Sequence, residues 1–200
     1  AKKVLYVSAE ESVEQVSMRA ERLGYKSSDV LLAGSTSADE IAVSIASNLY
    51  DVVVVDSIQT IGLDRLQSSA GTASQITQSA QLLSRAAKST GTSLIIVGHV
   101  TKEGSIAGPK LLEHLVDVVL HIEGDRYGGY KMLRSVKNRF GSTNDIGLFE
   151  MFEDGLRPVL NPSAAMLEER QKSDGSVVLA MLEGTRPLLV EVQALVTSTS

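Results

Sequence analysis

One segment, residues 51–60 (DVVVVDSIQT), constrains the fold of this chain more than any other. Four successive valines suit a strand that is buried on both faces of a parallel sheet. Ligands of open α/β sheets gather at the carboxyl ends of such strands. The segment therefore predicts a buried parallel strand that presents Asp56 to a cleft.

The position of Asp56 supports two interpretations. The pattern fits the Walker B element of nucleotide-hydrolysing enzymes, in which a strand-end aspartate holds Mg²⁺ through a bound water. Hydrophobic strands that end in aspartate also occur in α/β proteins that bind no nucleotide. From this segment alone both interpretations stay open.

Composition narrows the classes of function. The chain has 200 residues and is 43% hydrophobic, enough for one substantial core and a small second unit. Its net charge of −5 provides no global basic field, so a polyanion must be met locally. The absence of cysteine excludes disulfides and thiolate zinc sites. No apolar run reaches the roughly 20 residues of a membrane span, and we expect a cytoplasmic protein.

Strand and helix patterns alternate in the first half of the chain. Helical spacing of apolar residues follows three strand-like runs, and Ser37 with Glu40 predicts a capping box for the second helix. Such alternation favours right-handed crossovers and a parallel sheet with helices on its faces. The expected strands are 3–8, 30–33, 51–56 and 94–98, and the expected helices are 10–23, 37–49 and 76–87.

The pattern changes near residue 117. Strand-like runs (VDVVLHIEG, YKMLRSVKNR and IGLFEMFEDG) are separated there by short turns, which predicts antiparallel additions to the α/β fold. Three of the four prolines lie in the last 43 residues, where we expect a turn, a short helix around Met166 and two further strands. A domain boundary is predicted near Arg157.

Five segments together resemble the bacterial RadA (Sms) family of recombination and repair ATPases. The pentapeptide KNRFG at 137–141 is a signature of that family, and the similarity runs along nearly the whole chain. The tail, EGTRPLLVEVQALV at 183–196, resembles the opening of the family's Lon-protease-like domain. The five segments are SAEES (8–12), DVVVVDSIQT (51–60), VGHVTKEG (97–104), GPKLLEHLVDVVLHIEGD (108–125) and KNRFGSTNDIGLFEM (137–151).

The resemblance implies a RecA-like P-loop NTPase core over residues 1–157, followed at 158–200 by the first strands of a Lon-like α/β domain. Family members begin with a four-cysteine zinc module and a Walker A loop that cradles phosphates. The 200 residues contain no G-x-x-x-x-G-K-[ST] motif. We therefore expect the chain to be a fragment or a shortened form of such a protein, with its core truncated at the N-terminus.

The resemblance also assigns roles to three residues. Glu10 is implied as the catalytic glutamate that activates water, Asp56 as the Mg²⁺ residue, and His99 as a sensor of the γ-phosphate. Apart from the resemblance, Ser57 is expected either to support Asp56 by hydrogen bonding or to form a turn after the strand. Simpler roles exist. Glu10 fits the acidic start of a helix that Ser12 caps, and His99 fits an ordinary structural hydrogen bond.

Two cations lie in the KNRFG segment. Lys137 and Arg139 are two residues apart on a predicted strand, so they would project from one face. By resemblance they reach the neighbouring subunit's γ-phosphate, which would require a ring or filament. From spacing alone, a solvated strand face with alternating charge explains them as well.

Two polar loops, 62–74 and 100–110, resemble the DNA-contacting loops of RecA-like motors. Their cations Arg65, Lys102 and Lys110 are candidate DNA ligands. Aromatic residues make up only 4% of the chain, so contacts would be mainly to phosphate rather than by base stacking. Ordinary mobile surface loops are the alternative.

The sequence thus favours the motor core of a DNA-dependent ATPase that uses ATP and Mg²⁺ in recombination and branch migration. The implied partners are single-stranded or branched DNA, further subunits in a hexameric ring, and a RecA-type recombinase; no membrane is implied. The alternative is a non-catalytic scaffold, favoured by the missing phosphate loop. Without that loop we expect the 200 residues alone to be inactive.

Overall fold

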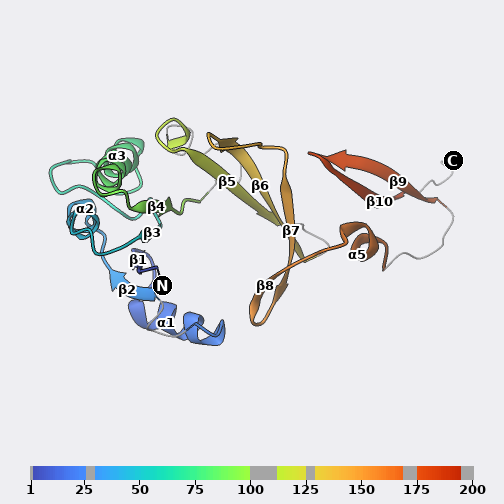
Figure 1. Ribbon diagram of the computed structural model, residues 1–200, viewed down its shortest axis with the longest axis horizontal. Coiled ribbons are helices and arrows are strands. Elements are labelled where there is room, and N and C mark those ends of the chain that lie inside the picture. Colours follow the sequence, from blue (N-terminus) through green and yellow to red (C-terminus); the bar gives the residue numbers. More distant parts are fainter. Residues whose placement is uncertain (1, 26–29, 100–111, 125–128, 169–174, 195–200) are drawn as a thin grey trace, which may run out of the picture. The chain divides into compact units, whose positions relative to one another are not determined.

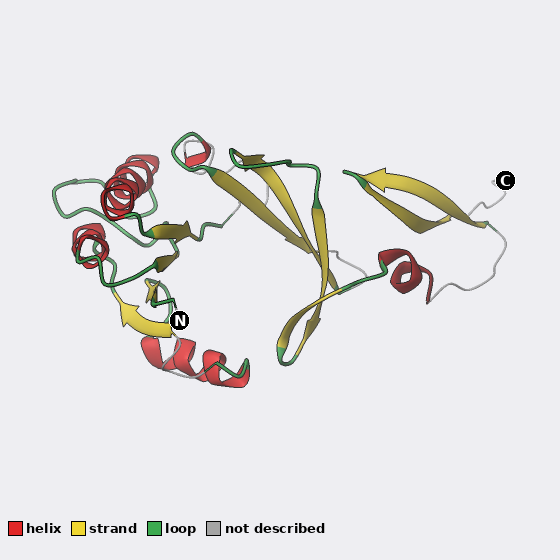
Figure 2. Cartoon of the chain, viewed as in Figure 1, coloured by secondary structure: helices red, strands yellow, loops and turns green. Residues whose placement is uncertain are grey.

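A computed structural model describes residues 2–25, 30–99, 112–124, 129–168 and 175–194. The chain forms two compact units, 1–116 and 117–200, whose elements are labelled in Figure 1 and coloured by type in Figure 2. Within the described residues no helix is long and apolar enough to cross a membrane.

The first unit contains the predicted parallel sheet. Its strand order is β2-β1-β3-β4, and every pairing is parallel. The four-valine run forms β3, an inner strand of this sheet. Val53 and Val55 are fully buried on one face, whereas Val52 and Val54 on the other face are only half-buried, so the burial predicted for both faces is found on one. The strands are β1 (Val4–Ser8), β2 (Val30–Gly34), β3 (Val52–Asp56) and β4 (Ser93–Ile96).

The three predicted helices of this unit are present as α1 (Val13–Arg22), α2 (Ala38–Ala46) and α3 (Ala73–Thr90). Ser12 caps α1 in a full capping box, because its side chain and that of Gln15 each accept the other's backbone N–H. This confirms the capping role expected for Ser12.

The capping box predicted for α2 forms only in part. The Ser37 side chain accepts from the Glu40 N–H, but the Glu40 carboxylate accepts the Ser35 hydroxyl at 2.7 Å. The Ser37 N–H donates to the same Ser35 oxygen at 3.1 Å. Ser35 therefore intervenes between the two predicted partners and satisfies both.

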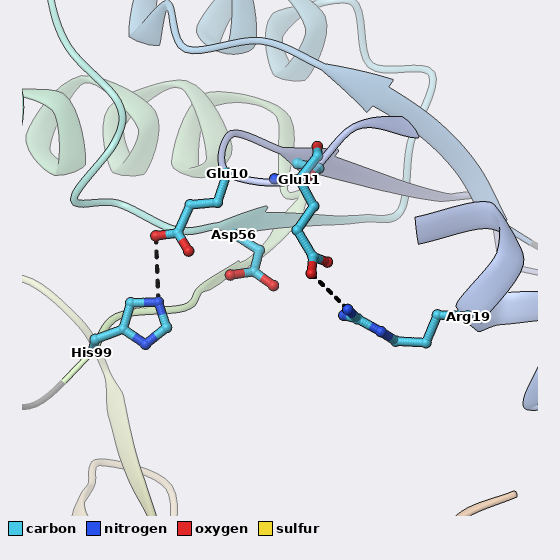
Figure 3. A pocket seen from close by; sticks show the side chains of 6 residues that line it. Glu10, Glu11, Arg19, Asp56 and His99 are labelled. Atoms are coloured by element: carbon cyan, nitrogen blue, oxygen red, sulfur yellow. Dashed lines mark hydrogen bonds and ion pairs between the residues drawn. The ribbon is translucent and has the colours of Figure 1, made fainter. Parts of the chain in front are cut away.

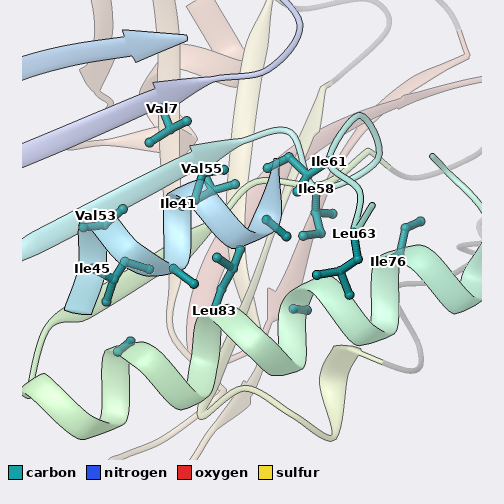
Figure 4. Packing of buried hydrophobic residues seen from close by; sticks show 14 of the residues in the cluster. Val7, Ile41, Ile45, Val53, Val55, Ile58, Ile61, Leu63, Ile76 and Leu83 are labelled. Carbon is teal, nitrogen blue, oxygen red and sulfur yellow. The ribbon is translucent and has the colours of Figure 1, made fainter. Parts of the chain in front are cut away.

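One face of the sheet packs against α2 and α3 and forms the core (Figure 4). Alternate residues of the central strands point into it, and the opposite face carries Tyr6, which lines a groove with Val16 and Ala20 of α1. Helices therefore cover both faces, as predicted. The labelled core residues are Val7, Ile41, Ile45, Val53, Val55, Ile58, Ile61, Leu63, Ile76 and Leu83.

The segment between β3 and α3 is anchored rather than loose at its start. Ile61 and Leu63 are buried, and Gln75 of α3, only 3% exposed, accepts from the Leu63 N–H at 2.8 Å. The Gln75 amide also donates to the carbonyl groups of Leu66 and Ser68. The loop predicted at 62–74 thus begins in the core, and its last two residues belong to α3.

The second unit contains an antiparallel sheet of order β5-β6-β7-β8 and a separate hairpin of β9 and β10. The short helix α5 (Pro162–Glu168) lies between them in sequence. This confirms the antiparallel additions, the short helix and the two last strands. The strands are β5 (Val118–Gly124), β6 (Tyr130–Asn138), β7 (Ile146–Phe152), β8 (Gly155–Pro158), β9 (Ser176–Glu183) and β10 (Arg186–Gln193).

The division into compact units falls after Val116, whereas the predicted domain boundary near Arg157 falls in β8, inside the second unit. The two boundaries rest on different features. The boundary near Arg157 is predicted from proline content. The boundary after Val116 coincides with the change from parallel to antiparallel strand pairing. The assignment of 158–200 to a separate family domain stays a prediction.

Leu83 offers a test of the core. Its side chain is fully buried in α3 (0% exposed), so Leu83→Ala should lower the free energy of unfolding by about 2–5 kcal/mol through lost contacts and a cavity. Urea denaturation measures this loss. Leu49→Ala, at a 57% exposed position, is the control and should change stability by less than about 0.5 kcal/mol. Equal losses in the two variants would contradict this packing.

Candidate functional site

Acidic side chains gather at the carboxyl ends of β1 and β3. The parallel register pairs Ser8, the last residue of β1, with Asp56, the last residue of β3. Glu10 and Glu11 follow β1 immediately, and His99 follows β4 on the other side of β3. Three neighbouring strand ends therefore contribute side chains to one place (Figure 3).

These side chains surround a cavity of about 170 Å³. Its lining includes three residues for which sequence analysis predicted a function, Glu10, Asp56 and His99. The structure thus brings together residues that are up to 89 positions apart in the chain. The other lining residues are Ser8, Glu11 and Arg19.

Glu10 is held by two groups from neighbouring strand ends. The hydroxyl of Ser57, a fully buried residue, donates to Glu10 Oε1, and His99 Nε2 lies 3.4 Å from the same oxygen. Ser57 was expected to support Asp56, and this expectation is wrong. The hydroxyl has one proton to donate, and it goes to Glu10.

Asp56 has a different hydroxyl partner. Tyr6 of β1 donates its hydroxyl proton to Asp56 Oδ2. Burial, and then the hydrogen bond to the Asp56 carboxylate, raise the pKa of Tyr6 well above its ordinary value. A phenol is protonated at neutral pH even without this shift, so Tyr6 can donate to Asp56 there.

A further ion pair closes one side of the cavity. Arg19 Nη2 of α1 lies 2.7 Å from Glu11 Oε1, and this hydrogen bond raises the pKa of Arg19 above its ordinary value. Figure 3 shows this pair on the opposite side of Asp56 from the pair formed by Glu10 and His99. Each of two acids beside Asp56 thus has its own nitrogen partner.

Sequence reasoning missed Tyr6 and Arg19. The strand period of two puts Tyr6, Ser8 and the cavity on one face, so alternation could have suggested Tyr6. No local signal indicates Arg19, because it lies eight residues from Glu11 and the turn before α1 separates the two.

The donor atoms around the cavity suit magnesium held through water. Carboxylate and hydroxyl oxygens are the hard ligands that Mg²⁺ prefers, and it usually keeps several waters and binds one or two carboxylates. Within the described part of the chain, no three His, Asp or Glu groups are close enough to form a metal site by themselves. Asp56, whose carboxylate lines the cavity, is a residue that could hold such an ion through a bound water.

The two predicted trans-acting cations belong to the second unit. Lys137 lies in β6 opposite Val119, whereas Arg139 lies one residue beyond the strand, so they do not share one strand as predicted. Asn138 ends β6 and accepts the Phe140 N–H at 2.9 Å, which begins a turn. Arg139 instead bonds to Asp117, through its backbone N–H at 3.0 Å and through Nη1 at 2.8 Å.

Of the three candidate DNA ligands, the structure describes Arg65. Its Nη1 lies 3.7 Å from Asp39 Oδ1, and both side chains are largely exposed. A surface pair of this length contributes little stability, and it leaves the guanidinium accessible. Lys102 and Lys110 lie outside the described residues.

Solved structures define the class of this fold. A KaiC-like protein from Pyrococcus horikoshii OT3 aligns with a TM-score of 0.60 and 17% identity, covering 79% of this chain and 76% of its own. The RadB recombinase aligns with a TM-score of 0.54 and 21% identity, covering 79% of each chain. The fold is therefore that of a RecA-like core.

Curated relatives then show which proteins the sequence resembles. The DNA repair protein RadA of Bacillus subtilis (strain 168) is 52% identical over 198 residues, and that of Halalkalibacterium halodurans is 50% identical over 199 residues. These alignments cover 98% and 99% of this chain. Along nearly its whole length the chain is similar to RadA proteins. It spans 43% and 44% of the length of these two relatives, and no family model matches it.

Proposed function

We propose that the protein carrying this chain is a DNA-dependent ATPase of RadA type, which acts in DNA repair and homologous recombination and moves branched DNA. The observation that carries this proposal is the convergence of Glu10, Asp56 and His99 at the strand ends of a RecA-like sheet. The names of the relatives, DNA repair proteins RadA, and of one structural neighbour, a recombinase, support the same role.

In this proposal each acid has a separate task. Glu10 orients the attacking water and accepts its proton, and Ser57 and His99 fix the direction of its carboxylate. Asp56 holds the metal through a bound water, and the metal, when present, neutralises charge on the phosphates. His99 lies beside Glu10 after β4, where it can respond to the state of the γ-phosphate.

The proposal also requires a second subunit. Lys137 and Arg139 would reach the nucleotide of a neighbouring protomer, in a ring that we propose to be hexameric. The ion pair with Asp117 supports this role, because it holds Arg139 in one orientation while about half of its side chain stays exposed. Such a fixed cation loses little conformational entropy when it binds a phosphate.

DNA would bind through the loops that follow β3 and β4. Arg65 is an accessible cation in the first loop, and Lys102 and Lys110 belong to the second. We propose single-stranded or branched DNA as the ligand, contacted mainly at phosphates, and a RecA-type recombinase as a partner. Residues 158–200 would begin the Lon-like domain.

Removal of the acids tests the catalytic proposal. In the intact parent protein, Glu10→Gln should lower the kcat of magnesium-dependent ATP hydrolysis about 100-fold or more, because it removes the general base. Asp56→Asn should abolish turnover at ordinary magnesium concentrations. Glu14→Gln, at a nearby position on α1, is the control for a change of charge. Unchanged DNA-stimulated hydrolysis in both site variants would overturn the proposal.

Mixed oligomers test whether Lys137 acts on its neighbour. Lys137→Ala and Glu10→Gln homo-oligomers should each be nearly inactive. A mixture allowed to exchange subunits should regain part of the hydrolysis. An intact site forms wherever a Lys137→Ala subunit supplies Glu10 and its Glu10→Gln neighbour supplies Lys137, whereas the reverse order gives no intact site. Mixed assembly is verified by native mass spectrometry. No recovery in verified mixed rings would show that Lys137 acts within its own subunit.

The 200 residues themselves favour a second candidate function, a non-catalytic scaffold, because they contain no G-x-x-x-x-G-K-[ST] motif. Phosphoryl transfer depends on positioning, and Glu10 and Asp56 alone do not hold a triphosphate. The purified 200-residue chain should therefore hydrolyse ATP no faster than its Asp56→Asn variant. A phosphate-release assay measures this, and magnesium-dependent turnover by the chain alone would contradict it.

A further inference from the structure

The strongest unassigned feature is the contact between Tyr6 and Asp56. We propose that Tyr6 is a positioning residue, which orients the Asp56 carboxylate so that one oxygen is presented to the hydrated metal ion. The inference rests on the proposed function, since it concerns the same site. Its evidence differs from the evidence for the proposed function, because it is the hydrogen bond between Tyr6 of β1 and Asp56 of β3.

The sheet register makes this contact direct. Tyr6 lies opposite Val54, and Ser8 lies opposite Asp56, so Tyr6 and Asp56 share one face of neighbouring strands and are offset by two residues. That offset corresponds to about 6.6 Å along the strands, at roughly 3.3 Å per residue. A phenol spans such a distance, and its hydroxyl reaches Oδ2 of Asp56.

The chemistry of the phenol suits this task. A tyrosine hydroxyl is a neutral donor, so it can fix a carboxylate without cancelling the negative charge that attracts a cation. It occupies Oδ2 and leaves Oδ1 available for a metal-bound water. A lysine or arginine in the same position would compete with the metal for the carboxylate.

The ring of Tyr6 is itself held in place. It lines a largely apolar groove together with Val16, Ala20 and Leu23 of the α1 segment, whereas its hydroxyl donates to Asp56, a residue of the acid cavity. The ring is half-buried at this groove, and the hydrogen bond to Asp56 fixes the hydroxyl end of the side chain. Residues that orient a metal ligand act well when their own conformation is fixed in this way.

A purely structural explanation exists, because a buried tyrosine hydroxyl usually finds some partner. The two explanations differ in what they predict for the metal. If Tyr6 only packs, its removal affects stability alone. If it orients Asp56, its removal weakens the affinity of the site for magnesium, so a higher magnesium concentration is needed before ATP binds and reacts.

The test uses the intact parent protein and a non-hydrolysable ATP analogue. The magnesium concentration for half-maximal binding of the analogue should rise roughly 10-fold in Tyr6→Phe, since outer-shell partners of metal ligands affect affinity by this order. Tyr50→Phe, another half-buried tyrosine of the first unit, is the matched control and should leave it unchanged. An unchanged magnesium dependence in Tyr6→Phe would overturn the inference.

A second measurement applies if Tyr6→Phe lowers the stability of the protein. The melting temperatures of Tyr6→Phe, Asp56→Asn and the double variant form a cycle, in which a direct contact makes the two losses non-additive. Additive losses would also overturn the inference. The two proposals can fail separately. If Tyr6→Phe shows the magnesium shift but the unsubstituted parent protein does not hydrolyse ATP, the proposed function is refuted and the role of Tyr6 stands.

Discussion

The parallel register of β1 and β3 is the constraint on which the rest of the first unit depends. It pairs Leu5 with Val53 and Val7 with Val55, and these residues fill the core beneath α2 and α3. The same register places Tyr6, Ser8 and Asp56 on the opposite face. Because side chains alternate along a strand, a slip of one residue would expose the core residues and bury the acid. Core packing and site geometry are therefore fixed together.

The cavity at the strand ends is lined by three carboxylates and therefore carries a concentration of negative charge. Glu10, Glu11 and Asp56 line one small cavity, where their like charges repel one another. Each carboxylate has a donor from another element: Ser57, Arg19 and Tyr6 respectively. These donors fix the carboxylates in direction, and two of the three are neutral hydroxyls. A local negative charge thus persists, which suits a cation and its waters.

The second unit presents its charges differently. The KNRFG segment ends β6 and turns at Asn138, and Arg139 is bonded to Asp117, the residue before β5. A cation held by one exposed ion pair keeps most of its donors accessible, because a guanidinium carries five N–H groups. This geometry agrees with a cation that binds an external anion as well as its own carboxylate.

The sequence by itself determined the elements of this protein and the residues that end its strands. The strands, the helices, the Ser12 cap and the placement of Glu10, Asp56 and His99 at strand ends follow from local periodicity and turn chemistry, which each segment carries alone. Family resemblance added roles that spacing could not supply.

Only the tertiary structure decided which side chains meet. Ser57 bonds to Glu10 instead of Asp56, Tyr6 takes that place, Arg19 pairs with Glu11, and Arg139 leaves the predicted strand. A hydroxyl or a guanidinium selects its partner from whatever the neighbouring strands and helices bring within about 3 Å. That choice depends on register and packing between segments far apart in the chain, which no local pattern encodes.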